Sequence, residues 1–273
     1  MRRLCKLYLL FFVACSGINT IHGKPVEIKV SVEPGGIKQI DLGANFNSDI
    51  IICGDKKFEV GSSKENKFFV YSESYFSDLN SKKCQSDNYI VNITVEDKKF
   101  PFEQLKVDKK RVSLSKKDLK RVQEEQELLN KLYAKPFQDI FPNNSFQLPI
   151  KSLVTSEYGK KRLFNKKRKS QHLGIDFRAK VGKKIEAANS GIVILSQDLF
   201  YTGFTVIIYH GLGIYTVYGH LSKLLVKDGE KVEKGKVIGL SGNSGRVTGP
   251  HLHWGVKVNG NWSNGKDLLT LKF

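Results

Sequence analysis

Residues 242–255 read GNSGRVTGPHLHWG, and the informative part is His251-Leu252-His253. Side chains alternate between the two faces of a β-strand, so residues two apart point the same way. If this stretch is extended, both imidazoles project from one face of a sheet. In that position they could bind one metal ion together or divide catalytic work between them.

Further upstream, the chain carries more residues of the same chemistry. His172 and Asp176 are four apart and share a face whether the backbone is helical or extended, and His220 lies between the two motifs. Only six histidines occur in 273 residues, and four of them belong to this group. The clustering predicts a metal site. We interpret the other two, His22 and His210, as ordinary surface or core histidines.

The C-terminal half has the pattern of an all-β domain. From about Pro149, short apolar runs alternate with glycine-rich turns. Ile185–Ser196 and Phe204–Tyr209 are rich in β-branched residues, and a tight turn follows at residues 211–213. Such runs separated by turn residues are typical of strands. We therefore predict one β domain over residues 149–273.

Two other parts precede this domain. Residues 24–107 read as β-rich, because apolar and polar residues alternate in Val26–Val32 and again in Tyr89–Val95. The period then changes to a helical one, which begins at a capping pattern at Ser115 and ends before Pro136. We predict an N-terminal β-rich domain over 24–107 and a linker over 108–148 with a helix at about 115–135.

The first 23 residues have the pattern of a secretory signal peptide. Basic residues precede the apolar run Leu7–Ala14, which is too short to span a bilayer. The residues up to Cys15 also resemble a bacterial lipoprotein signal, in which Cys15 would be lipidated and anchor the protein to a membrane. Ordinary cleavage after a later small residue is the alternative. Either reading predicts export to the periplasm or cell envelope, and the first predicts an outer-membrane lipoprotein.

Cys53 and Cys84 remain after removal of such a signal. In an exported protein, two cysteines favour a disulfide, which would contribute roughly 3–4 kcal/mol by restricting the unfolded chain. Two buried free thiols are the alternative. A zinc site made from these cysteines is disfavoured, because the sequence contains no C-x-x-C pair.

The chain is strongly basic, with a formal charge of +18 that becomes +15 (18 − 3) once the signal peptide is removed. Such a charge indicates an anionic partner. The export signal and the lack of an aromatic stacking pattern argue against nucleic acid. The bacterial envelope offers anionic lipids and carboxylate-bearing peptidoglycan. The basic run Lys160–Lys169, just before His172, could attract such a substrate or simply be a solvated loop.

Taken in order, these motifs resemble those of a known family. Residues 149–270 resemble the lysostaphin/LytM-type zinc metallopeptidases, which cut peptide bonds in bacterial peptidoglycan. The N-terminal β module and the linker helix resemble the layout of Gram-negative envelope members. The matching motifs are His172-x-x-x-Asp176, Tyr218-Gly219-His220-Leu221, the valine- and glycine-containing segment Val226–Gly239, and Gly249-Pro250-His251-Leu252-His253-Trp254.

The resemblance implies a mostly β fold whose C-terminal domain is an antiparallel sheet of the lysostaphin-like, duplicated hybrid motif kind. It also implies one zinc ion, bound by His172, Asp176 and His253, with His220 and His251 as catalytic residues. We expect a monomer. The basic segment at 166–169 and Asn264 depart from the family pattern, which bears on substrate preference rather than on catalysis.

The function implied is that of a zinc metalloendopeptidase acting on the stem peptide or cross-link of peptidoglycan in cell-wall remodelling. The chain has no His-Glu-x-x-His motif, so a histidine near the metal must take the part of general base. Which of His220 and His251 does so stays open at this point. The alternative function is a non-enzymatic LytM-type activator of cell-wall amidases.

Overall fold

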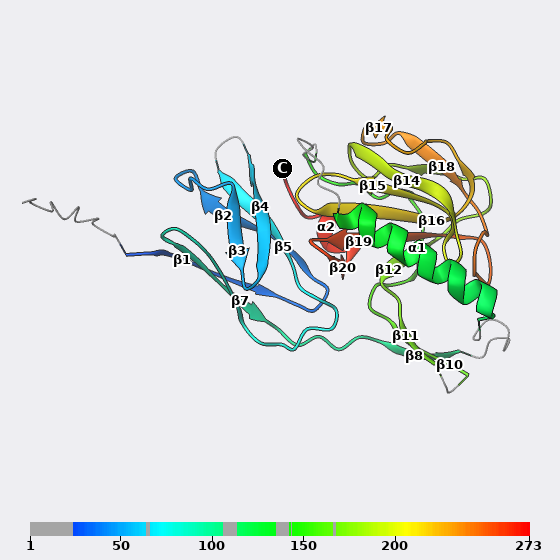
Figure 1. The fold of residues 1–273 in the computed structure, drawn as a ribbon, viewed down its shortest axis with the longest axis horizontal. Coiled ribbons are helices and arrows are strands. Elements are labelled where there is room, and N and C mark those ends of the chain that lie inside the picture. The colour runs from blue at the N-terminus through cyan, green and yellow to red at the C-terminus, as the bar shows by residue number, and fades with distance from the viewer. Residues whose placement is uncertain (1–23, 64–65, 106–113, 135–141, 143, 166–167) are drawn as a thin grey trace, which may run out of the picture.

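The computed structural model describes residues 24–63, 66–105, 114–134, 142, 144–165 and 168–273. It contains two β-rich parts, with helix α1 (Lys116–Ala134) lying along the C-terminal one (Figure 1). The predicted signal peptide, with Cys15 and His22, lies outside the described residues. Among the residues that are described, no helix is both long enough and apolar enough to cross a membrane.

The N-terminal part is a seven-stranded sheet whose order is β1-β7-β6-β3-β4-β5-β2. The strands at the two ends of this order, β1 and β2, contact each other, so the sheet curls toward a barrel. Its interior holds a cluster of large apolar side chains that includes Phe46, Phe69 and Ile93. The strands are β1 (Val26–Val32), β2 (Ile37–Gly43), β3 (Ile50–Cys53), β4 (Lys56–Ser62), β5 (Lys67–Ser72), β6 (Lys82–Ser86) and β7 (Tyr89–Val95).

A disulfide joins Cys53 on β3 to Cys84 on β6. The two residues are direct partners in the antiparallel register of these strands, with Cα atoms 4.0 Å apart. Both side chains are buried in the N-terminal core. The predicted cysteine pairing is therefore present, and it links two strands that are distant in sequence.

The C-terminal part is a ten-stranded sheet built around the antiparallel order β17-β14-β15-β16-β19-β12-β9. The central strands are almost entirely buried, as their β-branched and aromatic residues predict. The strands are β9 (Val154–Ser156), β12 (Gly174–Arg178), β13 (Lys184–Glu186), β14 (Gly191–Leu199), β15 (Gly203–Tyr209), β16 (Ile214–Leu224), β17 (Lys231–Val232), β18 (Val237–Ser241), β19 (His251–Val258) and β20 (Asn261–Ser263).

A third, small sheet connects the two parts. It consists of β11 (Arg168–Gln171), β10 (Lys161–Phe164) and β8 (Phe102–Leu105), in that order. The β10–β11 hairpin belongs to the C-terminal part, whereas β8 follows the N-terminal barrel-like sheet along the chain. The chain that leaves the N-terminal sheet thus pairs with the β10–β11 hairpin (Figure 1).

Helix α1 begins with the capping box predicted from the sequence. The Asp118 amide donates to Ser115 Oγ at 3.1 Å, and the Ser115 amide donates to the Asp118 carboxylate at 3.3 Å. Its apolar side chains Leu129, Leu132 and Tyr133 pack on the outer face of the C-terminal sheet. The predicted helix therefore packs against the β domain rather than forming a coiled coil.

The predicted fold class, mostly β with a linker helix, is confirmed. One detail differs, because the C-terminal half contains a single helical turn, α2 (Gly265–Leu268). Asn264 caps this turn, since its side-chain oxygen accepts from the Lys266 amide at 3.2 Å. The residue that departs from the family pattern thus starts a turn of helix that the strand-like sequence pattern did not predict.

Candidate metal centre

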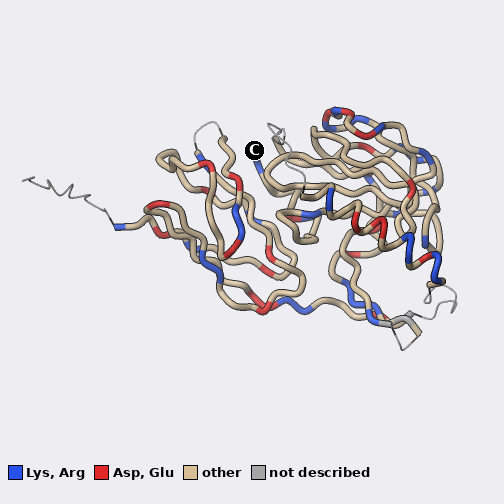
Figure 2. Tube along the Cα trace, viewed as in Figure 1, with Lys and Arg blue, Asp and Glu red and all other residues tan. Residues whose placement is uncertain are grey.

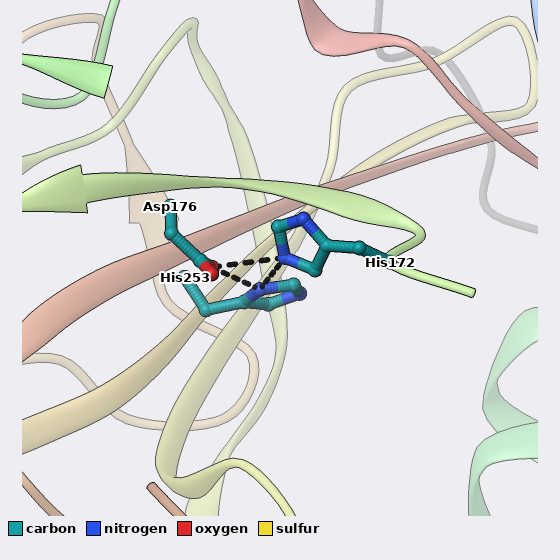
Figure 3. Close-up of side chains that lie close together, drawn as sticks. All are labelled: His172, Asp176 and His253. Carbon is teal, nitrogen blue, oxygen red and sulfur yellow. Dashed lines mark hydrogen bonds and ion pairs between the residues drawn. The ribbon is translucent and has the colours of Figure 1, made fainter. Parts of the chain in front are cut away.

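The metal-site residues come from two neighbouring strands. Strand β12 pairs with β19 so that Asp176 lies directly opposite His253, and His172 lies just before β12. Figure 3 shows the three side chains pointing toward one another from these elements. Their ligand atoms all lie within 4.8 Å of one another. The structure therefore brings together the three residues predicted to bind zinc.

The contact distances suit a small metal ion. Asp176 Oδ1 lies 3.0 Å from His172 Nε2 and 2.9 Å from His253 Nδ1, and the two nitrogens are 3.3 Å apart. Ligand atoms on a tetrahedral zinc with bonds of about 2.1 Å are separated by about 3.4 Å. Three protein ligands also leave one position open, as catalytic zinc sites do.

The hydrogen bonding of His172 gives a second indication of a cation. Its Nδ1 lies 2.9 Å from the Glu157 carbonyl oxygen, which can only accept, so Nδ1 carries the proton. In the neutral ring Nε2 then has a lone pair, and this lone pair faces the carboxylate oxygen of Asp176. Two acceptors facing each other at this distance are satisfied when a cation lies between them. The donor set therefore fits zinc.

Gly174 is required by the packing of the site. A Cβ atom at this position would lie 2.6 Å from Nε2 of His253 and closer still to its Cε1. Such a contact would displace the imidazole. The glycine between His172 and Asp176 therefore gives the His253 ring its space.

Burial and charge act together on the buried ligands. Burial alone would raise the pKa of Asp176, but the neighbouring His172 and His253 side chains lower that pKa well below its usual range. Burial lowers the pKa of His253, although the Asp176 carboxylate opposes this effect. Both shifts favour the forms that bind a metal, an ionised carboxylate and a neutral imidazole.

His220 and His251 lie beside this group, with ring centroids 4.7 Å apart. Nδ1 of His220 is 2.9 Å from the Ser244 carbonyl oxygen, and Nδ1 of His251 is 2.9 Å from the Gly249 carbonyl oxygen. Each Nδ1 therefore donates its proton to a carbonyl, and in the neutral ring each Nε2 is an acceptor. Nε2 of His251 is 3.7 Å from Asp176 Oδ1, so it faces the metal site.

The backbone of His220 is held in an unusual conformation. Its φ angle is +62°, in the left-handed region that side-chain-bearing residues seldom adopt. The amide of His220 donates to the Thr202 carbonyl at 2.6 Å, and this bond helps to hold the conformation. Burial, followed by the charges of His253 and His251, lowers the pKa of His220 to about 3. The ring is therefore neutral near pH 7.

The other predicted residues lie elsewhere. His210 is fully buried and away from the metal site, with Nδ1 2.7 Å from the Ser190 carbonyl oxygen and Nε2 2.7 Å from Thr216 Oγ1. It is a core histidine, as interpreted from the sequence. Of the basic run before His172, Lys161 and Arg162 lie on β10 and Lys169 lies on β11, in a hairpin that carries several of the basic residues in Figure 2.

Three supporting residues had no signal in the sequence motifs. Ser156 Oγ is 3.2 Å from Nδ1 of His172, and Arg162 donates to Ser156 Oγ at 2.8 Å. Arg162 also donates to Glu103 at 2.8 Å, across 59 residues of sequence. Only the parallel pairing of β8 with β10 brings these side chains together, and nothing in the local pattern of either segment predicts that pairing.

Two histidines and one aspartate on an antiparallel sheet, with two further histidines beside them, have the composition of a catalytic zinc site. The sequence comparisons name the family. Residues 170–265 match the family model described as peptidase family M23, the family of lysostaphin/LytM-type enzymes. The resemblance inferred from the motifs is confirmed.

Individual relatives support the assignment over different lengths. The chain is 44% identical over 108 residues to peptidoglycan DD-endopeptidase ShyA of Vibrio cholerae, which covers 39% of this chain and 25% of ShyA. It is 47% identical over 89 residues to ShyC of the same organism, covering 33% of this chain and 21% of ShyC. The chain thus matches about a quarter or less of the length of these relatives.

The similarity extends to the N-terminal part in one solved structure. A crystal structure from Pseudomonas aeruginosa, described as a peptidase M23, superposes with a TM-score of 0.68 at 25% identity. The superposition covers 91% of this chain and 96% of that one. The arrangement of N-terminal sheet, helix and C-terminal sheet is therefore shared with another protein.

Proposed function

We propose that this chain is a zinc-dependent endopeptidase that hydrolyses peptide bonds in bacterial peptidoglycan, within the stem peptide or its cross-link. The observation that carries the proposal is the grouping of three ligand atoms with His220 and His251 beside them. The relatives ShyA and ShyC are named as peptidoglycan DD-endopeptidases, which supports the same substrate class.

In this proposal His172, Asp176 and His253 hold the zinc. Bound zinc makes its water acidic near neutral pH and polarises a carbonyl group. His220 and His251 handle protons through Nε2, because Nδ1 of each ring is already bonded to a backbone carbonyl. One ring accepts the proton of the attacking water. That proton then passes to the leaving amine, directly or by way of the other ring, which in its protonated form also stabilises the oxyanion.

An enzyme fits the residues better than an activator. An activator that works only by binding another protein needs neither a complete ligand set nor two histidines with Nε2 as acceptor. This chain has all five residues, within reach of one another. The amidase-activator alternative is therefore disfavoured.

We further propose that the protein acts in the cell envelope as a monomer. An envelope location follows from a peptidoglycan substrate, and the Cys53–Cys84 disulfide suits an oxidising compartment. The finer proposal is a lipoprotein anchored through Cys15. Mass spectrometry of the mature protein tests it, because lipidation predicts a modified Cys15 at the N-terminus and ordinary cleavage predicts a later, unmodified start.

Digestion of purified peptidoglycan tests the enzymatic proposal. We expect the zinc-loaded protein to release muropeptides with a newly exposed amine and carboxylate, and a chelator to abolish the release. A matched control is His210→Gln, which alters a histidine away from the site and should leave the products unchanged. If several wall types yield no chelator-sensitive products while an added amidase is stimulated, the activator function is correct.

A further inference from the structure

A series of polar contacts connects strand β8 with the back of the metal site. Glu103 on β8 and Arg162 on β10 are direct partners in the parallel register of these strands. Arg162 Nε donates to Glu103 at 2.8 Å, and its Nη2 donates to Ser156 Oγ at 2.8 Å. The same Nη2 lies 3.8 Å from Asp176 Oδ2. The guanidinium of Arg162 therefore faces both the Glu103 carboxylate and the carboxylate of the metal ligand Asp176.

The two oxygens of Asp176 have separate surroundings. Oδ1 faces the nitrogens of His172 and His253, whereas Oδ2 faces Arg162. An ion pair at Oδ2 holds the carboxylate so that a single oxygen points toward the metal. Ser156, which receives the hydrogen bond from Arg162, also lies 3.2 Å from Nδ1 of His172. Arg162 is thus connected to two of the three ligands.

We propose that Arg162, itself held by Glu103, is a positioning residue for the zinc site. The inference rests on the proposed function, because it concerns the same zinc. Arg is suited to this task since its planar, rigid fork donates in two directions at once, whereas lysine offers a single point charge on a flexible stem. Groups that orient metal ligands in this way raise metal affinity.

Glu103 also has an electrostatic role, because its negative charge opposes the positive charge of Arg162. A guanidinium near a ligand of a divalent cation repels that cation unless its charge is balanced. The Glu103 carboxylate supplies the balance, and Lys160 lies 3.3 Å from its other oxygen. The Glu103 side chain is 29% exposed and that of Arg162 is 23% exposed, so the pair is only partly screened by water.

These contacts make the metal site depend on residues outside the matched family segment. Glu103, Ser156 and Arg162 all precede residue 170, where the family match begins. Glu103 belongs to the segment that leaves the N-terminal sheet. Zinc binding by the C-terminal sheet is therefore coupled to the placement of β8.

The test measures zinc affinity of the full chain by competition with a chromophoric chelator, without substrate. We expect Arg162→Lys to weaken zinc binding by about 10- to 100-fold, the usual range for groups that orient metal ligands. Glu103→Gln should weaken it in the same direction but less, because it acts through Arg162. Melting temperatures of the metal-free variants are read in parallel, since a merely structural role would lower these without changing zinc affinity.

Matched controls make the same chemical changes away from this series. Glu230→Gln alters a carboxylate that pairs with Lys236 at 2.6 Å, and Arg178→Lys alters an exposed arginine on β12. Both should bind zinc like the wild type. The double variant Glu103→Gln/Arg162→Lys should lose no more affinity than Arg162→Lys alone, because the two residues act as one unit.

Unchanged zinc affinity in both single variants would overturn the inference, as would losses that simply add in the double variant. If Arg162→Lys does not fold, the isosteric Glu103→Gln variant decides the question by itself. A wild-type protein that binds no zinc would overturn the proposed function. If instead the wild type binds zinc and the variants bind it equally well, only the positioning role of Arg162 is overturned.

Discussion

The buried surroundings of His210 make the stability of the whole protein depend on pH. It is fully buried, and both of its ring nitrogens face hydrogen-bond partners inside the C-terminal sheet. Burial lowers the pKa of His210 to about 4, although its bond to Ser190 opposes the shift. Protonation is therefore easier in the unfolded chain, where the pKa of histidine is near 6.5.

The sign of the effect on stability follows from this difference. Above pH 6.5 neither state is protonated at His210 and the free energy of unfolding is unaffected. Below pH 6.5 the unfolded chain binds a proton that the folded protein excludes, so stability falls until about pH 4, by about 3 kcal/mol for this residue. His220 and His253 act in the same direction in the metal-free protein.

Urea unfolding of the metal-free protein between pH 7 and pH 4 checks this prediction. The free energy of unfolding should fall with decreasing pH, and His210→Gln should make the fall shallower. The variant is expected to be less stable than the wild type at pH 7, because it leaves the buried partners of the ring imperfectly bonded. An identical pH dependence in the two proteins would contradict the assignment of His210 as a buried neutral histidine.

At the scale of single residues, the sequence predicted the metal-site residues because they lie in short motifs. Spacing and family resemblance pointed to His172, Asp176 and His253, and the structure brings them together. Arg162 and Glu103 could not be predicted, because a salt bridge between residues 59 apart depends on which strands pair. The sequence of a basic run does not reveal whether its side chains are solvated or form ion pairs.

At the scale of elements, α1 supports the turn that lies next to His220. Both carboxylate oxygens of Glu125 accept from the amide of Phe200, at 2.9 and 3.1 Å, at the tip of the β14–β15 hairpin. Two residues further on, the carbonyl of Thr202 accepts from the amide of His220 at 2.6 Å. The helix is therefore connected to the strained backbone of a predicted catalytic residue.

Replacing Glu125 should loosen this turn. We expect Glu125→Gln to destabilise the protein by about 1 kcal/mol, the net scale of a typical intramolecular hydrogen bond, and to speed amide hydrogen exchange at His220. Hydrogen exchange followed by mass spectrometry measures the second effect. Glu124→Gln, on the neighbouring and exposed residue, is the matched control. Equal exchange at His220 in both variants would show that α1 does not support the turn.

The sequence pattern predicted the helix and several strands, but it did not predict how these elements pack against one another. The capping residue Ser115 and the recurrence of apolar residues predicted a helix that the structure places at Lys116–Ala134. Leu119, one of those apolar residues, is 46% exposed, while the charged Glu125 makes the contact with the hairpin. Helical periodicity alone therefore could not identify the face that docks.

At the scale of the whole molecule, one hydrophobic cluster contains residues of both β-rich parts. Ile37, Phe68 and Val70 of the N-terminal sheet belong to the same buried cluster as the C-terminal sheet. Phe68 packs edge to face on Phe273 with ring centroids 5.8 Å apart. A hydrogen bond also joins the two parts, since Ser72 Oγ donates to the Val258 carbonyl at 2.6 Å. The two parts are thus packed as one unit.

A shared core predicts that the two parts unfold together. Phe68→Ala, at the interface, and Phe58→Ala, in the separate N-terminal core, should each lower the stability of a single transition by about 3–5 kcal/mol. Calorimetry combined with near-UV circular dichroism checks this. If Phe58→Ala produced a first transition that left the C-terminal sheet intact, the parts would be independent.

This shared core could not be read from the sequence. Phe68 lies in a run of apolar residues that predicts a strand, but such a run does not reveal which of its side chains face a neighbouring domain. Long-range packing of this kind is decided by tertiary contacts between segments that are about 200 residues apart.

The measurement that tests the central claim most directly records zinc content and peptidoglycan hydrolysis together in two sets of variants. Asp176→Asn and His253→Gln should lose both zinc and activity. His220→Ala and His251→Ala should keep one zinc per chain and lose activity by about 100- to 10,000-fold, the usual contribution of proton-transfer groups. Full zinc content in the ligand variants, or near-normal hydrolysis in both histidine variants, would contradict the account.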